Sequence, residues 1–218
     1  MGRTALMVLA VVLLIGSAAA FARSEKLKLV ASPVAKPEFD RHLSPTCGCA
    51  RRTAQLSLLL RRPERLDASV VDADGGHVAT LVEGRELPAG RAAFDWNGRD
   101  DDGQVVPDGR YRLKIRLEHD RRTILIPKTI VVDTVPPRAE LIQAVRTADR
   151  VEVRYRTNES AHVLLRLNGR TVARNGPESG KGTLEWAPAG VAATEVVLVA
   201  VDRSGNRSVP VPVLVASS

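Results

Sequence analysis

The sequence predicts an all-β protein in which two β-sandwiches follow one another after an N-terminal hydrophobic helix. Beyond the first residues, apolar side chains recur at every second position, and no stretch keeps the 3.6-residue period of an amphipathic helix. Short alternating segments succeed one another, with Gly, Asn, Asp and Pro between them. A pair of prolines divides this series into two halves, and each half is long enough to bury a core of its own.

Residues 1–22 have the features of a signal peptide or a signal anchor. Arg3 supplies a short basic start, residues 5–15 are apolar, and residues 20–22 read Ala-Phe-Ala, which fits a small-x-small cleavage pattern. Residues 5–22 are also just long enough to cross a bilayer uncleaved. The basic residues that follow favour cleavage. We therefore expect an exported protein, which is either membrane-anchored through this helix and facing outside, or secreted.

Residues 23–53 form a lead-in segment that is expected to contain the first edge strand and that holds Cys47 and Cys49. In an exported chain, an even number of cysteines suggests a disulfide. A bridge between residues two apart closes a tiny ring and gains little loop entropy, so it would be a local clip. A metal site would need further ligands, and His42 is the only nearby candidate.

Residues 54–133 are predicted to form the first domain. The segments 54–63 and 65–84 give three short strands, with Asp-Ala-Asp-Gly-Gly as the turn between the second and third. In the segment 110–118, apolar residues alternate with charged ones, so that one face packs on the core and the other meets water. The returning strand of a hairpin follows.

The best domain boundary is the segment Asp-Thr-Val-Pro-Pro-Arg-Ala-Glu at 133–140. Two consecutive prolines fix φ and cannot join a central ladder, so they make a short semi-rigid spacer. Residues 134–218 are predicted to form the second domain because the β pattern restarts there. Its turns are expected at residues 157–160, at the Asn-Gly pair that follows, and at residues 204–206.

The acidic stretch FDWNGRDDDGQVVPDGRYRLKI at 94–115 is open to a calcium interpretation. As an EF-hand loop that starts at Asp95, it has Asn97 at the third position but Arg99 at the fifth, so the template fails. A looser oxygen cage remains open because Ca²⁺ accepts flexible ligand sets. The candidates for such a cage are Asp95, Asn97, Asp100 and Asp102.

No pattern in the sequence favours catalysis. The carboxylates of the acidic stretch stand in a strongly polar run, so they are not expected to have the raised pKa that a glycosidase acid requires. The four histidines stand singly, and no G-x-S-x-G nucleophile elbow occurs. The sequence therefore predicts a protein that is not an enzyme and that holds no cofactor.

Turn chemistry accounts for every part of the acidic stretch. Its Asn-Gly and Asp-Gly pairs stand where positive φ is cheap, and Pro-Asp-Gly has the order of a tight β-turn. The Trp and the Tyr lie on the flanking strands, where their ring polar atoms can reach the backbone. The residues with a predicted structural role are Trp96, Gly98, Gly103, Gly109 and Tyr111.

This stretch resembles the Ig-like domain named after the flagellar hook-capping protein, the FlgD-like domain, over about residues 54–133. The positions that carry the resemblance are Gly90, Trp96, Asn97, Gly98, Arg99, Asp100, Asp101, Gly103, Val106, Asp108, Gly109 and Tyr111. Downstream, the segments DTVPP, TNESAHVLLRLNG and LVAVDRSGN resemble bacterial Ig-like or fibronectin-type-III-like modules. These resemblances imply two tandem Ig-like β-sandwiches with a non-catalytic role. A Sec-type leader and a short lead-in depart from the hook-capping protein, so flagellar assembly is not implied.

The formal net charge of +7 attracts anionic material weakly. An aromatic content of 3 % argues against a nucleic-acid partner of the base-stacking kind. The leading hypothesis is a non-catalytic exported cell-envelope protein whose modules contact other envelope proteins or a surface polymer. The alternatives are a calcium- or carbohydrate-binding extracellular module that uses the Asp-rich corner, and an accessory subunit of an extracellular enzyme.

Overall fold

The structure is a computed structural model. It describes Leu13, Gly16, Ser17 and residues 32–147, 149–176, 178–187 and 196–214. The predicted signal or anchor helix therefore lies outside the described residues, except for those first three. In the described part of the chain, no helix is long and apolar enough to cross a membrane. Apart from the helical residues Leu13, Gly16 and Ser17 and the 3-10 turn η1 (Ala50–Arg52), the elements of this part are strands, which confirms the predicted all-β class.

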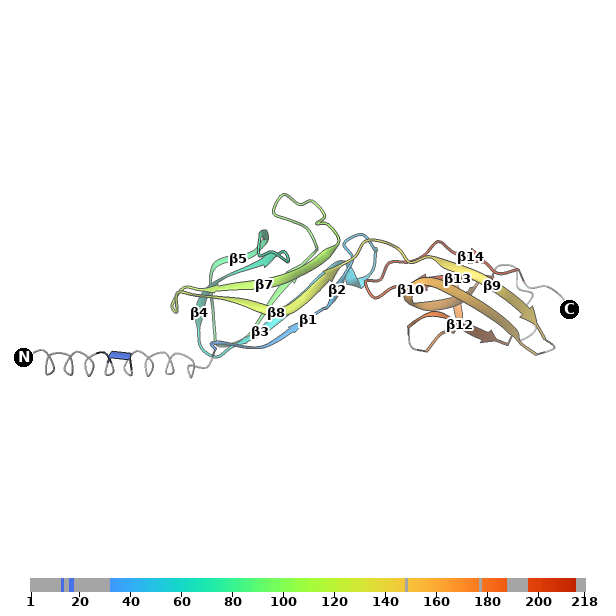
Figure 1. The fold of residues 1–218 in the computed structure, drawn as a ribbon, viewed down its shortest axis with the longest axis horizontal. Coiled ribbons are helices and arrows are strands. Elements are labelled where there is room, and N and C mark those ends of the chain that lie inside the picture. Colours follow the sequence, from blue (N-terminus) through green and yellow to red (C-terminus); the bar gives the residue numbers. More distant parts are fainter. Residues whose placement is uncertain are drawn as a thin grey trace, which may run out of the picture.

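Two β-rich modules lie end to end, joined by the segment between β8 and β9 (Figure 1). The strands are β1 (Val34–Phe39), β2 (His42–Leu43), β3 (Ala54–Leu60), β4 (Glu64–Val71), β5 (His77–Leu87), β6 (Gly90–Trp96), β7 (Gly109–Leu117), β8 (Arg122–Val132), β9 (Ala139–Arg146), β10 (Val151–Leu167), β11 (Arg170–Arg174), β12 (Ser179–Trp186), β13 (Val196–Val201) and β14 (Val211–Pro212).

The first module, residues 34–132, is a sandwich of two sheets. One sheet has the order β1-β3-β6 and the other the order β2-β8-β7-β4-β5. The lead-in segment supplies β1, which pairs antiparallel with β3, and β2, which pairs parallel with β8. On β7 the buried and more exposed side chains alternate, as predicted, because successive side chains of a strand point to opposite faces. The buried ones join a single apolar core that both sheets share.

The second module, residues 139–213, is organised around the long strand β10. The first part of β10 pairs with β9 and β12, and its last part pairs with β13 and β11. A separate apolar core is formed by these strands and includes Val153, Val163 and Leu198. Each module thus has a core of its own.

The turn expected at residues 157–160 is wrong, because β10 runs straight through this segment. The pairing register with β12 shifts there, between Arg156 and Ala161. Thr157 is buried, and its hydroxyl donates to the carbonyl oxygens of Glu159 and Ser179. The polar residues that predicted a chain reversal therefore stabilise a β-bulge. At this bulge, the strand passes from one sheet to the other.

The proline-rich spacer between the modules is pinned at both ends. Asp133 donates its N–H to the carbonyl of Leu43, and Thr134 donates its N–H to Asp108 Oδ1 at 2.9 Å. At the far end, Arg138 donates its N–H to Asn158 Oδ1 at 2.6 Å. These bonds fix the path of the spacer relative to both modules.

Candidate functional site at the joint between the modules

The acidic corner of the first module is anchored by two aromatic side chains in its core. Trp96 Nε1 donates to the carbonyl of Arg99 at 2.9 Å, and the hydroxyl of Tyr111 donates to the carbonyl of Pro107 at 2.7 Å. The two rings contact each other in a tilted geometry, with centroids 5.1 Å apart. The corner is therefore held by side-chain bonds to its own backbone.

The three glycines of this corner are all expected in turns, and Gly98 and Gly103 have the positive φ that such turns use. Gly98 has φ 71° and is packed so tightly that an added Cβ would lie 2.3 Å from Cγ of Pro45. Gly103 has φ 77° with open space around it, and Gly109 is the first residue of β7. Gly98 thus allows the lead-in segment to approach the corner closely.

The side chains of the acidic corner cap backbone amides. Asp100 Oδ1 accepts hydrogen bonds from the N–H groups of Asp102 and Gln104. Asn97 Oδ1 accepts from the N–H of Arg99. Asp101 accepts from the N–H of Thr80 at 2.6 Å, and this bond, followed by that to His77, lowers the pKa of its carboxyl.

The calcium candidates of this corner are not brought together around a common point. Asp95 lies on β6 and is exposed, and the side chain of Asn97 is engaged in its own turn. One group of three carboxylates in the described part of the chain has oxygen atoms close enough to share an ion, and it contains neither Asp95, Asp100 nor Asp102. That group lies at the joint between the modules.

Three loops of five residues, 72–76, 100–104 and 202–206, are built alike. Each loop starts with an Asp whose backbone N–H donates to the carbonyl of the fifth residue. The carbonyl of this Asp accepts from the N–H of the fourth residue, which is a glycine with positive φ. One carboxylate oxygen of the Asp accepts from the N–H of the fifth residue. The first two loops are largely exposed, whereas the third is buried except for Arg203. This third loop packs against the first module.

Asn206, the last residue of the buried loop, connects both modules and the spacer. Its Oδ1 accepts a hydrogen bond of 2.5 Å from Ser44 Oγ of the first module. Its Nδ2 donates to the carbonyl of Asp133 in the spacer at 2.9 Å and to Asp202 Oδ2 at 2.8 Å. Because the side chain is 3 % exposed, these bonds are shielded from water.

The loop reaches the first module at the Cys47–Cys49 disulfide, which the structure contains. Gly205 has φ 91°, and an added Cβ would lie 2.5 Å from Cys49 Sγ. Glycine is therefore needed at this position for two reasons, the backbone conformation and the close approach to sulfur. The disulfide occupies both sulfur atoms, so neither is a thiolate ligand for a metal.

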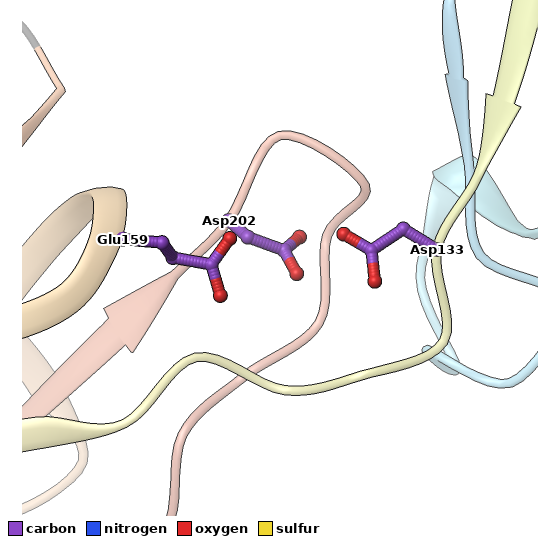
Figure 2. A group of neighbouring side chains, drawn as sticks. All are labelled: Asp133, Glu159 and Asp202. Carbon is purple, nitrogen blue, oxygen red and sulfur yellow. The ribbon is translucent and has the colours of Figure 1, made fainter. Parts of the chain in front are cut away.

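Asp133, Glu159 and Asp202 form the acidic cluster beside this contact. They come from the spacer, from β10 and from the end of β13, and their ligand oxygens lie within 4.8 Å of one another. Figure 2 shows the carboxylate of Asp202 between the other two. Asp202 is buried, and the other two are half-buried.

Burial raises the pKa of both half-buried carboxyls of the acidic cluster. The pKa of Glu159 is raised mainly by burial and then by the charges of Asp133 and Asp202. For Asp133, burial and the charge of Asp202 raise the pKa, against the hydrogen bond from the N–H of Val135. None of the ion pairs among the described residues includes a member of this cluster. Such a set of oxygens suits a hard divalent cation.

The sequence offers only a partial signal for this cluster. Asp133 and Asp202 stand in segments that sequence reasoning singled out, the spacer and the last hairpin turn. Glu159 belongs to a segment expected to be a turn, and nothing in its spacing relates it to the others. Their meeting depends on how the second module docks on the spacer, which is a long-range property.

Residues 53–120 match the family model described as the FlgD Ig-like domain, which confirms the resemblance of the first module. The basal-body rod modification protein FlgD of Salmonella typhimurium is 38 % identical over 69 residues, which is 31 % of this chain and 29 % of that protein. The FlgD protein of Salmonella typhi matches to the same extent. The chain thus spans less than a third of the length of these relatives.

Solved structures also resemble the chain. FlgD from P. aeruginosa matches with a TM-score of 0.31 and 21 % identity, over 47 % of this chain and 73 % of that one. The BSP domain of a biofilm-associated protein matches with a TM-score of 0.30 and 15 % identity, over 85 % of this chain and 30 % of that one.

Proposed function

We propose that the protein is a non-catalytic, exported cell-envelope protein whose two Ig-like modules contact other envelope proteins or a surface polymer. The observation that carries this proposal is the FlgD Ig-like match over residues 53–120, in a module whose acidic stretch is used to cap turns. Export rests on the signal pattern of residues 1–22.

The arrangement of polar groups in the first module supports a non-catalytic role. One contact there joins a histidine, an acid and a hydroxyl: His77, Asp101 and Thr80. A relay of the Ser-His-Asp kind needs the acid on one ring nitrogen and the nucleophile on the other. Here the same Nε2 atom of His77 contacts Asp101 Oδ2 at 2.7 Å and Thr80 Oγ1 at 3.4 Å. The ring therefore cannot pass a proton between them.

The second module offers a surface for an anionic polymer. A groove of about 530 Å³ lies on its β9-β10-β12 sheet, with Ile142 among the residues that line it. Arg154, Arg156 and Lys181 also line the groove. Arg156 is paired with Glu140, whereas the ion pairs of the described residues include neither Arg154 nor Lys181. These two cations are available to phosphate or carboxylate groups.

Binding to isolated envelope polymers tests the proposed contact. A triple variant with Ala at the three groove cations should lose at least about tenfold in affinity, since each lost contact with an anion weakens binding. The matched control removes three exposed arginines of the first module and so changes net charge equally. Its residues are Arg110, Arg121 and Arg122. Equal losses in both variants, or binding by neither the parent nor the control, would contradict polymer binding at the groove.

A second candidate function is cation binding, and the observation that favours it is the unpaired acidic cluster at the joint. Thermal unfolding of the full chain with increasing Ca²⁺ tests it, because a ligand of the folded state raises the melting temperature with concentration. A Glu159→Gln variant should abolish a shift that arises at the joint, and an Asp102→Asn variant should abolish one that arises at the acidic corner. A melting temperature that does not respond to Ca²⁺ removes this candidate.

A further inference from the structure

The Cys47–Cys49 disulfide lies in the loop between β2 and β3, where the second module docks. This loop is closed by hydrogen bonds from the N–H of Ser44 to the carbonyl of Arg51, and from the N–H of Cys47 to the carbonyl of Ser44. Gly48, between the two cysteines, has φ 61° and is exposed. The disulfide thus shapes the tip of a small loop on the first module.

This disulfide contributes little to the overall stability of the chain. A bridge between residues two apart removes little entropy from the unfolded state, because the closed loop is so short. Its effect is therefore local and consists of holding the tip of the loop in one conformation. What that tip contacts decides what the disulfide does.

The tip contacts the buried loop 202–206 of the second module. Gly205 approaches Cys49 Sγ so closely that it has no room for a side chain, and the same glycine also lies beside Arg51. Next to this contact, Ser44 donates its hydroxyl proton to Asn206. From the first module, Ser44 hydrogen-bonds across the joint, and Cys49 and Arg51 lie against Gly205. All three belong to the loop between β2 and β3 that the disulfide shapes.

The disulfide lies in a partly exposed part of the folded protein. Cys47 and Cys49 are half-buried, and the residues next to them at Thr46, Gly48 and Ala50 are exposed. Enclosure would protect a purely structural disulfide from reduction, because access is one of the factors that govern the rate of thiol–disulfide exchange. Here an accessible bond supports a contact between two modules.

We infer that the Cys47–Cys49 disulfide is a redox-sensitive support for the docking of the second module. Reduction of this disulfide then loosens the joint. This inference goes beyond the proposed function and does not depend on what the modules bind. The chemical class of the partner is a dithiol reductant, either a small dithiol or a protein with a pair of neighbouring thiols. The reaction that links the two states is thiol–disulfide exchange.

The exchange balances as follows. A thiolate of the dithiol attacks one sulfur of the bridge, the bond between Cys47 and Cys49 breaks, and the other cysteine leaves as a thiolate. The second thiol of the reductant then attacks the mixed disulfide and releases the first cysteine. Two electrons pass from the dithiol, which becomes a disulfide, and two protons end on the sulfurs of the two cysteines. Oxidation by a disulfide of the same class reverses the step.

Loss of the bridge affects the joint through the geometry of the tip. Without the bond, Gly48 and its neighbours are free to leave the conformation that Gly205 contacts, and Ser44 loses the hydrogen bond from the N–H of Cys47. The contact between Ser44 and Asn206 depends on that conformation. The spacer contact of Asn206 then becomes accessible to water.

Hydrogen exchange of the full chain, with and without a dithiol, tests the inference. Alkylation followed by mass measurement first counts two new thiols in the reduced protein. The amides of Asp133 and Asn206 bond to Leu43 and to Asp202, beside the contact of Asn206 with Ser44. We expect them to exchange about tenfold faster after reduction, because the lost contact no longer shields these bonds from water. The amides of Ile115 and Leu165, in the centres of the two modules, should keep their protection.

Two variants separate redox chemistry from a general effect of the reductant. A Cys47→Ser/Cys49→Ser variant should exchange rapidly at the joint in both conditions and should not respond to the dithiol. An Asn206→Ala variant keeps the disulfide but breaks the contact, so its joint should be open before reduction and unchanged after it. The parent chain, measured before and after reduction, keeps the test valid even where a variant folds poorly.

Either of two results would overturn the inference. The first is full reduction of the parent, counted as two alkylated thiols, with no change in exchange at the joint. The second is a disulfide that resists the dithiol while the modules remain folded, because a bond that cannot be reduced in the native state controls nothing. The inference is supported if the dithiol speeds up exchange at the joint in the parent and does not change the exchange rate in either variant.

Discussion

Substitution of Asn206 by Ala should destabilise the second module and free the joint at the same time. The side chain is almost fully buried and makes three hydrogen bonds, to Ser44, Asp133 and Asp202. Its removal leaves the buried carboxylate of Asp202 without one of its donors. A net cost of about 1 kcal/mol for a neutral bond, and more for a bond to a charged group, gives a total of about 2–4 kcal/mol.

Asn175→Ala is the matched control for this prediction. The side chain of Asn175 also makes two bonds to backbone within the second module, accepting from the N–H of Val163 and donating to the carbonyl of Ala161. Both variants should therefore lower the free energy of unfolding of the second module. Only the Asn206 variant should also open the joint.

Urea unfolding followed by hydrogen exchange measures both effects, because the midpoint reports stability and the amide of Asp133 reports the joint. An Asn206→Ala variant that loses less than about 0.5 kcal/mol, the size of an ordinary surface substitution, would contradict this prediction. An Asn175→Ala variant that frees the Asp133 amide to the same degree would contradict it as well.

The remaining predictions concern the corner and the acidic cluster. Gly98→Ala should destabilise the first module by about 1–3 kcal/mol in urea unfolding, because the added Cβ would overlap the ring of Pro45. Gly103→Ala should cost less. Gly103 also has positive φ, but an added Cβ there meets no atom within 4 Å. The raised pKa values of Asp133 and Glu159 mean that these two carboxyls bind more protons in the folded chain than in the unfolded chain above about pH 4, so their contribution to stability should fall as pH rises through this window. Glu159→Gln should flatten that dependence in melts between pH 4 and 7, and a slope unchanged from the parent would contradict the role of the cluster.

Local patterns predicted the longer strands of the first module, but not the short strand β2 or the 3-10 turn η1. Alternation over residues 110–118 fixed which face of β7 is buried, since a strand admits only two faces. The Asp-Gly pair in the acidic stretch predicted a turn, because a glycine in the left-handed region is the residue type such a turn requires. Both inferences used information that lies within a few residues of the element itself.

The second module shows where local patterns failed. The polar run at 157–160 has the composition of a turn, but its side chains can bond to the backbone equally well in a bulge. Propensity could not decide between these outcomes, because the pairing of β10 with four partner strands is set by tertiary contacts.

The joint could not be predicted, because its members are distant in sequence. Ser44 and Asn206 are 162 residues apart, and the loop that holds Asn206 has the same backbone bonds as two exposed loops of the first module. In the structure its burial distinguishes it from those two loops, and burial follows from how the modules dock. A clue was present in composition: this copy carries Ser204 and Asn206 where the exposed copies carry Asp74 and Gly76, or Asp102 and Gln104.

The location of the mature protein shows whether the chain is exported to the envelope. Cells that produce the full chain are fractionated, the intact cells are treated with an external protease, and the N-terminus of the recovered protein is sequenced. We expect the protein in the envelope or the secreted fraction, and we expect the external protease to cleave it when it is bound at the cell surface. The N-terminus should be Arg23 if the leader is cleaved, and the leader should be intact if it anchors the chain. A protein recovered from the cytoplasm with its leader intact would contradict the account.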